Sequence, residues 1–449
     1  MDWNQKMTRR ELFKRAGQFS MAGALLYLAA CAPKSSGNNL GGASDSLDDE
    51  FTGRLSLLLN SEMTYIAALA PAYQSQHGVN PAIEYVTTTD LKNKLTSAFV
   101  ARQSQWDSVF VTAEIGAELA DKGWLVDLDA KAASIVNGSR PILEGAFGAG
   151  QFSGKTYAIP VTTGCPVMLW NKKMMADAGL DPEAPANWHS TPGSWDTMVE
   201  YAKAMTGSRN GTEHYGLVDA WAGPHVLWMY GSLIQMHGGD LLDLDNQPVM
   251  NSEAGIEALQ KMVDLLHTHK CIDPGSVTYT WVFDASPGFL AGTRGIFTTW
   301  PFMAGVAEGD DSAIKGHVGV APNPSVKTSA SVDGSEFLSI PVYAKNQAEA
   351  WRFIELVTSY ENQRKQGIET PWLPIYSELL DDPEVLKTNP TASVVKQAYQ
   401  YPTKGYRSAD YSQWTNILSE EVHQALNRSK SPKDALNDAV NKINSSRSA

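Results

Sequence analysis

Strand-like runs alternate with helical runs in the first part of the chain, and this alternation limits the fold more than any other feature. In the helix expected over residues 90–102, Leu91, Leu95 and Phe99 recur every four positions and share one face. Strands that alternate with helices of this length favour parallel strands joined by right-handed crossovers. The expected strands are residues 55–60, 82–86 and 107–112, and the expected helices are residues 65–77, 90–102 and 115–122. The pattern predicts an α/β fold.

A second set of elements begins after residue 160. We expect a strand over 166–170, a helix over 172–178 and a helix over 195–205 with Ser194 as its N-cap. Two later helices carry apolar stripes: Ile256, Leu259, Val263 and Leu266 in one, after a cap at Asn251 or Ser252, and Leu436, Ala439, Val440 and Ile443 in the other, after a cap at Ser431. Because 449 residues exceed what one core usually supports, two lobes are expected.

The first thirty-one residues have the pattern of an export signal that ends at a lipid attachment point. Arg9 and Arg10 stand in a basic leader, residues 16–33 carry no charge, and small residues precede Cys31. The uncharged stretch is marginal for a membrane span, so we expect cleavage and a mature chain that starts at Cys31. The leader is similar to a twin-arginine signal joined to a bacterial lipoprotein cleavage site. The alternative is a short buried helix over residues 19–30.

Residues 31–50 are expected to form a disordered tether, because they contain few apolar side chains that could be buried. Removal of residues 1–30 takes five basic and two acidic residues from a net charge of −13, which leaves −16. No run of lysine or arginine follows the leader, so nucleic acid is excluded as a partner. We expect a monomer held in the cell envelope, on the periplasmic or extracytoplasmic face, by lipid on Cys31.

Cys165 and Cys271 are the two cysteines that remain after Cys31. A bridge between them would close a loop worth about 4 to 5 kcal/mol in the chain-entropy model. Twin-arginine export carries proteins that fold in the reducing cytoplasm, where two buried thiols are the commoner arrangement. We therefore expect both thiols to be free.

Motifs that would indicate an enzyme are incomplete. Gly154-Lys155-Thr156 ends like a phosphate-binding loop, but Ala149 stands where the first glycine belongs and a strand-like run follows. His267 and His269 near Cys271 have the pattern of a polar helix end rather than a metal site. We expect no catalytic residues, no metal and no cofactor. A surface-anchored enzyme that degrades polysaccharide remains the alternative.

Four of the thirteen tryptophans stand in loops beside glycine, proline or small polar residues: Trp221, Trp281, Trp300 and Trp372. Each could simply pack under a loop, with its indole N–H bonded to a carbonyl group. Flat indole faces also stack on the C–H faces of sugar rings, while acids and amides bind the hydroxyl groups. Several such residues in one chain indicate a carbohydrate cleft.

A series of short motifs occurs in a specific order. The series is Gly154-Lys155-Thr156-Tyr157-Ala158-Ile159-Pro160, Leu169-Trp170-Asn171-Lys172, Ala178-Gly179-Leu180, Ser194-Trp195-Asp196, Gly238-Gly239-Asp240, Phe289-Leu290-Ala291-Gly292, Trp300-Pro301 and Val318-Gly319-Val320-Ala321-Pro322. In order and spacing it resembles the extracellular solute-binding protein family of ABC importers, in its maltose-binding-protein-like branch. The match runs from about Leu55 to the C-terminus.

The resemblance implies two α/β lobes with a cleft between them, which closes on a ligand by hinge motion. The first lobe would comprise residues 51–160 and 322–372, and the second residues 163–320 and 376–449. Crossing segments are expected near residues 158–163, 320–324 and 371–376. The function implied is capture of a sugar, a mono- or oligosaccharide, and its delivery to membrane permease subunits. A polyamine or a glycerophosphodiester is the non-sugar alternative for the same fold.

The resemblance also implies where the ligand would be contacted. Expected contacts are Asn60, Ser61, Glu62, Thr112 and Glu114 from loops of the first lobe, Thr162, Thr163 and Trp372 from the crossings, Glu336, and Trp221, Trp281 and Trp300 from the second lobe. Two departures from the family pattern argue against a maltodextrin. Asp333-Gly334-Ser335-Glu336 stands where the family often has two glycines and an aromatic residue, and Trp170 stands where the family usually has tyrosine. For the three glutamates, an exposed or helix-capping role is the alternative.

Overall fold

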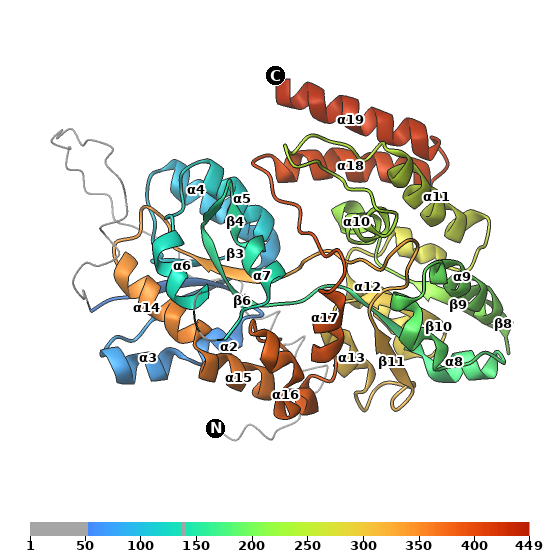
Figure 1. Cartoon of the computed structure of the whole chain (residues 1–449), viewed down its shortest axis with the longest axis horizontal. Helices are drawn as coiled ribbons and strands as arrows, with labels where there is room; N and C mark the ends of the chain where they lie inside the picture. The colour runs from blue at the N-terminus through green and yellow to red at the C-terminus, as the bar shows by residue number, and fades with distance from the viewer. Residues whose placement is uncertain (1–52, 137, 139, 449) are drawn as a thin grey trace, which may run out of the picture. The chain divides into compact units, whose positions relative to one another are not determined.

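The computed structural model of the protein describes residues 53–448 except 137 and 139, and Figure 1 shows how its helices and strands are arranged. The predicted signal peptide, the predicted lipidation site Cys31 and the predicted tether lie outside the described residues. Among the described residues, no helix is both long and apolar enough to cross a membrane. Two five-stranded sheets with helices packed on them organise this part of the chain, which confirms the predicted α/β fold.

The first sheet has the strand order β2-β1-β3-β12-β6. Its strands are β1 (Ser56–Asn60), β2 (Ala82–Val86), β3 (Ser108–Thr112), β6 (Ala158–Thr162) and β12 (Glu336–Ser339). The parallel pairing of β1 with β2 and β3 confirms the crossover pattern that the sequence predicted. β12 lies antiparallel between β3 and β6, although it comes much later in the chain.

The helices beside the first sheet agree with the prediction, except that one predicted helix is divided in two. Leu91, Leu95 and Phe99 of α4 (Thr88–Val100) are fully buried, and α5 (Ala113–Asp121) follows β3. The helix predicted over 65–77 is instead two helices, α2 (Thr64–Ala67) and α3 (Ala70–His77). Pro71 is the reason, because proline has no N–H to donate to Ala67 and its ring blocks a continuous helix there.

The second sheet has the strand order β11-β7-β10-β9-β8. Its strands are β7 (Val167–Asn171), β8 (Gly207–Arg209), β9 (Thr212–Val218), β10 (Arg294–Thr299) and β11 (Val318–Ala321). β9 and β10 are parallel, whereas β7 runs antiparallel to both β10 and β11. Each sheet has a hydrophobic core of its own, and Cys165 and Cys271 are buried free thiols in separate clusters of the second one.

Helices α8 (Lys172–Asp177), α9 (Ser194–Met205), α10 (Val226–Met236), α11 (Glu253–His267), α18 (Tyr411–Leu426) and α19 (Pro432–Ser448) belong to the second sheet's part of the chain. α18 and α19 lie side by side (Figure 1). The predicted caps at Ser252 and Ser431 are confirmed, since each hydroxyl accepts a hydrogen bond from a first-turn amide. The predicted N-cap at Ser194 is wrong: the helix starts at that residue, and its hydroxyl donates to the Trp188 carbonyl instead.

Segments between the sheets are tied to one another by hydrogen bonds. The Thr162 hydroxyl, at the end of β6, donates to the Leu373 carbonyl over 2.8 Å, and Thr163 forms an antiparallel bridge with Leu373. The chain passes from β11 in the second sheet to β12 in the first through residues 322–335. α14 (Gln347–Thr358) packs against the first sheet, and α17 (Ala392–Ala398) contacts β7 of the second.

The segment Gly154-Lys155-Thr156 forms a tight hairpin rather than a phosphate-binding loop. β4 (Gln151–Phe152) pairs with β5 (Lys155–Thr156), and the turn places Ser153 and Gly154 at φ angles of 50° and 77°. Strand β6 follows Thr156, so no helix N-terminus is there to receive a phosphate group.

Candidate functional site

Three glutamates converge at one edge of the first sheet. Glu62 follows β1, Glu114 lies in the first turn of α5 directly after β3, and Glu336 opens β12. β12 is paired so that Glu336 lies opposite Thr112 on one side and Thr162 on the other. Since β1 and β3 are adjacent parallel strands, their carboxyl ends meet at this edge. The structure therefore brings together five of the residues that the sequence predicted.

Burial and mutual repulsion keep these carboxyl groups from ionising easily. Burial, followed by the charges of Glu62 and Glu114, raises the pKa of Glu336 to about 8. Burial also raises the pKa of Glu114, although its own backbone amide and the Thr112 hydroxyl oppose that rise. Partial desolvation raises the pKa of Glu62, whose side chain still reaches solvent. At neutral pH the Glu336 carboxyl is therefore mostly protonated.

Tyr65 completes this edge of the sheet, and the sequence analysis did not select it. Its side chain is 8% exposed, and within the described part of the chain its hydroxyl has no hydrogen-bond partner. Burial and the Glu336 charge raise the pKa of Tyr65 well above its ordinary value, so the hydroxyl stays a donor. Its ring packs on Trp372 with centroids 5.8 Å apart, which brings this predicted residue to the same edge.

Asn60 and Ser61 occupy the turn that presents Glu62. Asn60 is buried. Its side-chain Nδ2 donates to the Thr88 hydroxyl over 2.7 Å, and its side-chain Oδ1 accepts from the Glu62 backbone amide over 3.0 Å. Ser61 is exposed, and its backbone amide donates to the Val86 carbonyl. Asn60 thus shapes the turn between β1 and α2, and this turn exposes both Ser61 and Glu62.

The second sheet contributes a group of tryptophans. Trp300 directly follows β10, and Trp281 is the N-cap of α12 (Val282–Leu290); their ring centroids lie 6.5 Å apart. Trp228 of α10 packs edge-on against Trp300 at 4.9 Å. Trp281 is 36% exposed. Trp221, by contrast, is fully buried in the hydrophobic core and does not join this group.

A small pocket lies behind Trp300. It is lined by Pro166, Asp219, His225, Trp228, Met229, Val282, Thr298, Thr299 and Trp300. Burial raises the pKa of Asp219 to about 7 and lowers the pKa of His225. The His225 Nδ1 lies 2.7 Å from the Ala220 carbonyl, so Nδ1 carries the proton and Nε2 is an acceptor. Nε2 and the Thr299 hydroxyl are buried without partners among the described residues.

The sequence analysis missed Asp219, His225, Trp228 and Thr299. Asp219 and Thr299 lie where the parallel strands β9 and β10 end. A prediction of strand β9 would have indicated them, because carboxyl ends of adjacent parallel strands are common ligand sites. Trp228 carries no such signal, since it sits in the apolar helix α10.

Residues 333–336 connect the tryptophans with the glutamates. A Cβ atom on Gly334 would come within 2.3 Å of the Trp300 ring, so the indole lies directly against this backbone. Asp333 is buried, and burial raises its pKa to about 6. The Tyr399 hydroxyl donates to Asp333 and lies 3.2 Å from the Thr163 hydroxyl. Thr162 and Thr163 are buried, and their hydroxyls serve hydrogen bonds within the crossings.

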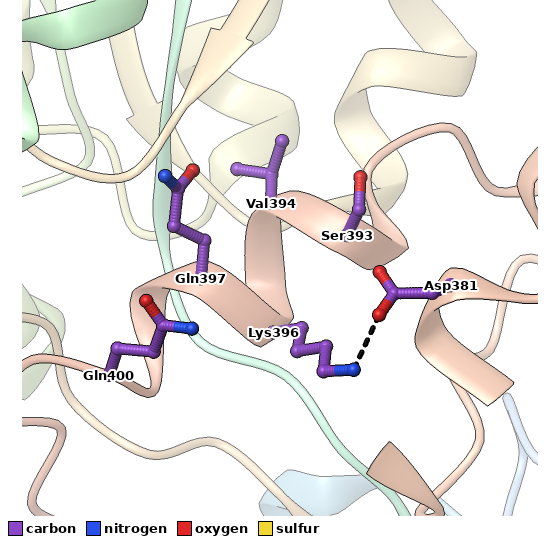
Figure 2. A pocket seen from close by; sticks show the side chains of 6 residues that line it. All are labelled: Asp381, Ser393, Val394, Lys396, Gln397 and Gln400. Carbon is purple, nitrogen blue, oxygen red and sulfur yellow. Dashed lines mark hydrogen bonds and ion pairs between the residues drawn. The ribbon is translucent and has the colours of Figure 1, made fainter. Parts of the chain in front are cut away.

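Two other places in the described residues offer no comparable chemistry. A shallow pocket lies along η5 (Ser377–Asp381) and α17, where Asp381 forms an exposed ion pair with Lys396 (Figure 2). His267, from the pattern rejected as a metal site, lies with Nε2 2.7 Å from the Leu426 carbonyl. In the described part of the chain, no group of three His, Cys, Asp or Glu side chains could hold a metal ion.

Comparison with known families identifies the class of protein. The family profile described as bacterial extracellular solute-binding protein matches residues 59–364. Because this match covers more than half of the 449 residues, the chain belongs to that family. The resemblance drawn from the motifs is therefore confirmed.

Curated relatives share about a quarter of the aligned residues. A probable amino-acid ABC transporter periplasmic-binding protein of Sinorhizobium fredii is 25% identical over 299 residues, which cover 66% of this chain and 65% of the relative. The maltotriose-binding protein of Pyrococcus abyssi is 24% identical over 356 residues, 76% of this chain and 70% of the relative. The sn-glycerol-3-phosphate-binding periplasmic protein of Salmonella paratyphi A is 24% identical over 313 residues, 65% of this chain and 67% of the relative. The matches span about two thirds of these relatives.

Solved structures of solute-binding proteins share the fold over nearly their whole length. Maltose-bound MalE3 of T. maritima superposes with a TM-score of 0.75 at 24% identity and covers 87% of this chain and 99% of its own. The GacH receptor of Streptomyces glaucescens, solved without ligand and with acarbose, gives a TM-score of 0.73 at 22% identity, with 88% and 98% coverage. The two-lobed fold expected from the motifs is thus confirmed.

Proposed function

We propose that this solute-binding protein serves an ABC importer, captures a sugar, either a mono- or an oligosaccharide, and delivers it to membrane permease subunits. Its family membership supports the solute-binding part of the proposal. Relatives named for maltotriose binding and structural neighbours with maltose or acarbose support a sugar. We do not propose an enzyme, because these relatives are named for binding.

One observation supports a sugar most directly. Carboxylates and a buried hydroxyl gather at the edge of the first sheet, and the tryptophan group of the second sheet contacts the same segment at Gly334. Indole faces stack on the C–H faces of a sugar ring, whereas carboxylates accept strong hydrogen bonds from its hydroxyls. Closure of the two lobes would bury such a ligand between these groups, away from water.

The proposed contacts are a revised form of the predicted set. Glu62, Glu114, Glu336, Trp281, Trp300 and Trp372 are retained, and Tyr65, Trp228 and His225 are added. Asn60, Thr162 and Thr163 act by holding backbone turns and crossings, as their buried hydrogen bonds indicate. Trp221 is removed from the set because it lies in the core.

We propose that the protein is a monomer and that its folded part consists of the two lobes expected from the sequence. We assign residues 51–160 and 322–372 to the first lobe and residues 163–320 and 376–449 to the second. A lipid on Cys31 would hold this body at the extracytoplasmic face of a membrane through the tether over 31–50. The leader sequence supports this placement.

A phosphate-bearing solute suits this site poorly. Phosphate groups are bound by arginine or lysine in planar or point-charge contacts. The groups that perturb Glu62, Glu114 and Glu336 are burial, neighbouring carboxylates, backbone and hydroxyl groups, and no cation is among them. A glycerophosphodiester would therefore meet repulsion at this edge.

Isothermal titration of the purified chain with mono- and oligosaccharides tests the proposal. We expect saturable binding of one sugar class and recovery of that sugar intact by mass spectrometry. Trp300→Ala should weaken binding at least tenfold, whereas Trp124→Ala should not. Trp124 is a matched control because it is partly exposed just after the C-terminal end of α5, whereas the glutamate edge meets its N-terminal end. Cleavage of the sugar, or equal affinity of the Trp300 variant, would contradict the proposal.

A further inference from the structure

The glutamate edge of the first sheet gathers three acidic side chains without a basic partner among the described residues. In the described part of the chain, no ion pair joins Glu62, Glu114 or Glu336 to a basic side chain, and Glu336 Oε2 is buried without a hydrogen-bond partner. Carboxylates this close repel one another, and burial strengthens the effect. A bound cation would reduce the repulsion between the carboxylates and would also give Glu336 Oε2 a partner.

The cations near this edge already have other partners. Lys92 forms an ion pair with Glu118, whose other carboxylate oxygen accepts the Ser412 amide over 2.7 Å. Arg407 donates to the Gly148 and Gln151 carbonyls, and its charge acts on Asp333 rather than on the three glutamates. The other groups coupled electrostatically to this edge are acids or phenols. The Asp333 charge raises the pKa of Glu114, the Glu114 charge raises the pKa of Tyr411, and the Glu336 charge raises the pKa of Tyr65. None of these groups supplies positive charge.

Tyr65 gives an independent indication of a ligand. Its side chain is more than nine-tenths buried, and its hydroxyl has no partner among the described residues although it lies within the field of Glu336. A buried hydroxyl without a partner costs free energy, and a bound ligand can supply the partner. A ligand here must offer an acceptor to Tyr65 and a donor to Glu336.

The tryptophan group favours a ligand that is both cationic and carbohydrate-like. Trp281 and Trp300 present indole rings tilted by 35° to each other, and Trp228 backs them. Indole faces attract cations and also stack on sugar C–H faces. A metal ion would not use these rings, whereas an ammonium group and a sugar ring both would.

We propose that the solute is a sugar that carries a protonated amine, and that Glu62, Glu114 and Glu336 bind the ammonium group while the tryptophans stack on the ring. This inference rests on the proposed sugar-binding function and narrows it. Tyr65 would donate to a neighbouring ring or hydroxyl oxygen. His225 Nε2 and the Thr299 hydroxyl would then serve the hydroxyls at the opposite side of the ring.

A matched series of sugars tests the inference. Glucosamine, N-acetylglucosamine and glucose, together with their β-1,4-linked disaccharides, differ only in the group at one ring carbon. Calorimetry on the full purified chain should show that each free amine binds at least tenfold more tightly than its N-acetyl and hydroxyl counterparts. Spermidine, a cation without a sugar ring, should bind more weakly than the amino sugars.

Two charge-neutralising variants assign the effect to the site. Glu336→Gln should reduce the preference for the amine to threefold or less, while Glu213→Gln should leave it unchanged. Glu213 is an exposed carboxylate of β9, so it controls for the change in net charge. Equal or tighter binding of the neutral sugars would overturn the inference but leave the sugar-binding function standing. Binding of spermidine alone, or of no sugar, would overturn both.

Discussion

Trp300 lies directly against Gly334, so that a Cβ atom at residue 334 would come within 2.3 Å of two carbons of the indole ring. One residue belongs to the loop after β10 of the second sheet, and the other to the segment that leads into β12 of the first. The ring position of Trp300 is thus set by a backbone that also carries Glu336. This contact links the aromatic and the acidic parts of the site.

Gly334→Ala should displace the Trp300 ring, because the added methyl group has no space beside it. We expect a loss of about 1 to 3 kcal/mol in the free energy of unfolding and weaker sugar binding. Denaturant titration and calorimetry measure the two effects. Gly305→Ala is the control, since a Cβ atom there meets nothing within 4 Å. Unchanged binding in the Gly334 variant would show that the ring position does not matter.

Trp300→Ala and Trp221→Ala should separate binding from stability. Trp221 is fully buried in the core, so its truncation should lower the free energy of unfolding by about 3 to 5 kcal/mol. Trp300 is partly exposed, so its truncation should cost less stability but reduce sugar affinity. Urea unfolding and calorimetry on both variants give the comparison. A reversal of the two profiles would place Trp221, and not Trp300, at the ligand.

Glu336 should make the protein less stable as pH rises. Its pKa is about 8 in the folded state, against an ordinary value of 4.5 for a glutamate carboxyl, so between these values the folded state binds the extra proton. Stability therefore falls from pH 4.5 towards pH 8 and stays lower above it. Glu336→Gln should remove this loss and be more stable than the natural chain by up to about 5 kcal/mol at about pH 9.

Chemical denaturation of Glu336→Gln at about pH 5 and about pH 9 measures the effect. At the lower pH the two proteins should differ little, because the Glu336 carboxyl is already protonated in the folded state. Glu213→Gln should follow the natural chain at both values. A Glu336 variant that is equally stable or less stable at the higher pH would contradict the raised pKa.

Binding of an amino sugar at neutral pH should release a proton. In the free protein Glu336 is mostly protonated, since its pKa is about 8, and an ammonium group beside it would lower that pKa. Binding enthalpies measured in phosphate and in HEPES should then differ, because the two buffers take up the proton with different enthalpies. Glu336→Gln should give the same enthalpy in both. The absence of a buffer effect in the natural chain would show that the ammonium group binds elsewhere.

Cys31→Ser should remove the lipid anchor that the leader sequence predicts. We expect the natural chain to sediment with membranes after expression in a bacterium with lipoprotein processing, and the variant to remain in the soluble fraction. Intact-mass analysis checks the acyl groups on residue 31. A variant that stays with membranes would show that another segment holds the protein there.

The sequence predicted local structure correctly where the signal lies within one helix or strand, such as an apolar periodicity or a capping residue. Leu91, Leu95 and Phe99 define the buried face of α4, and Ser431 caps α19, as predicted. Ser194 misled the prediction because its hydroxyl is used by a distant partner, the Ser325 amide, at 2.9 Å. A contact between residues 131 positions apart leaves no local signal.

The site could be predicted only where a local sequence signal exists, and residues placed by long-range packing were missed. Glu62 and Glu114 directly follow predicted strands, so their position at the sheet edge could be derived from parallel pairing. Trp221 and Trp281 look alike in sequence, yet one is fully buried and the other is 36% exposed. Only tertiary packing distinguishes them. Trp228 and His225 were missed because their role depends on how α10 lies against Trp300 and Trp281.

The position of β12 has a consequence for the order of synthesis. β3 and β6 emerge from the ribosome long before residues 336–339, yet both pair with the strand formed by those residues. The first sheet therefore stays open along its middle until all five strands of the second sheet have been made. Closure across such a sequence distance is slow. A twin-arginine route, as the leader predicts, would let the cytoplasm complete this insertion before the chain meets the membrane.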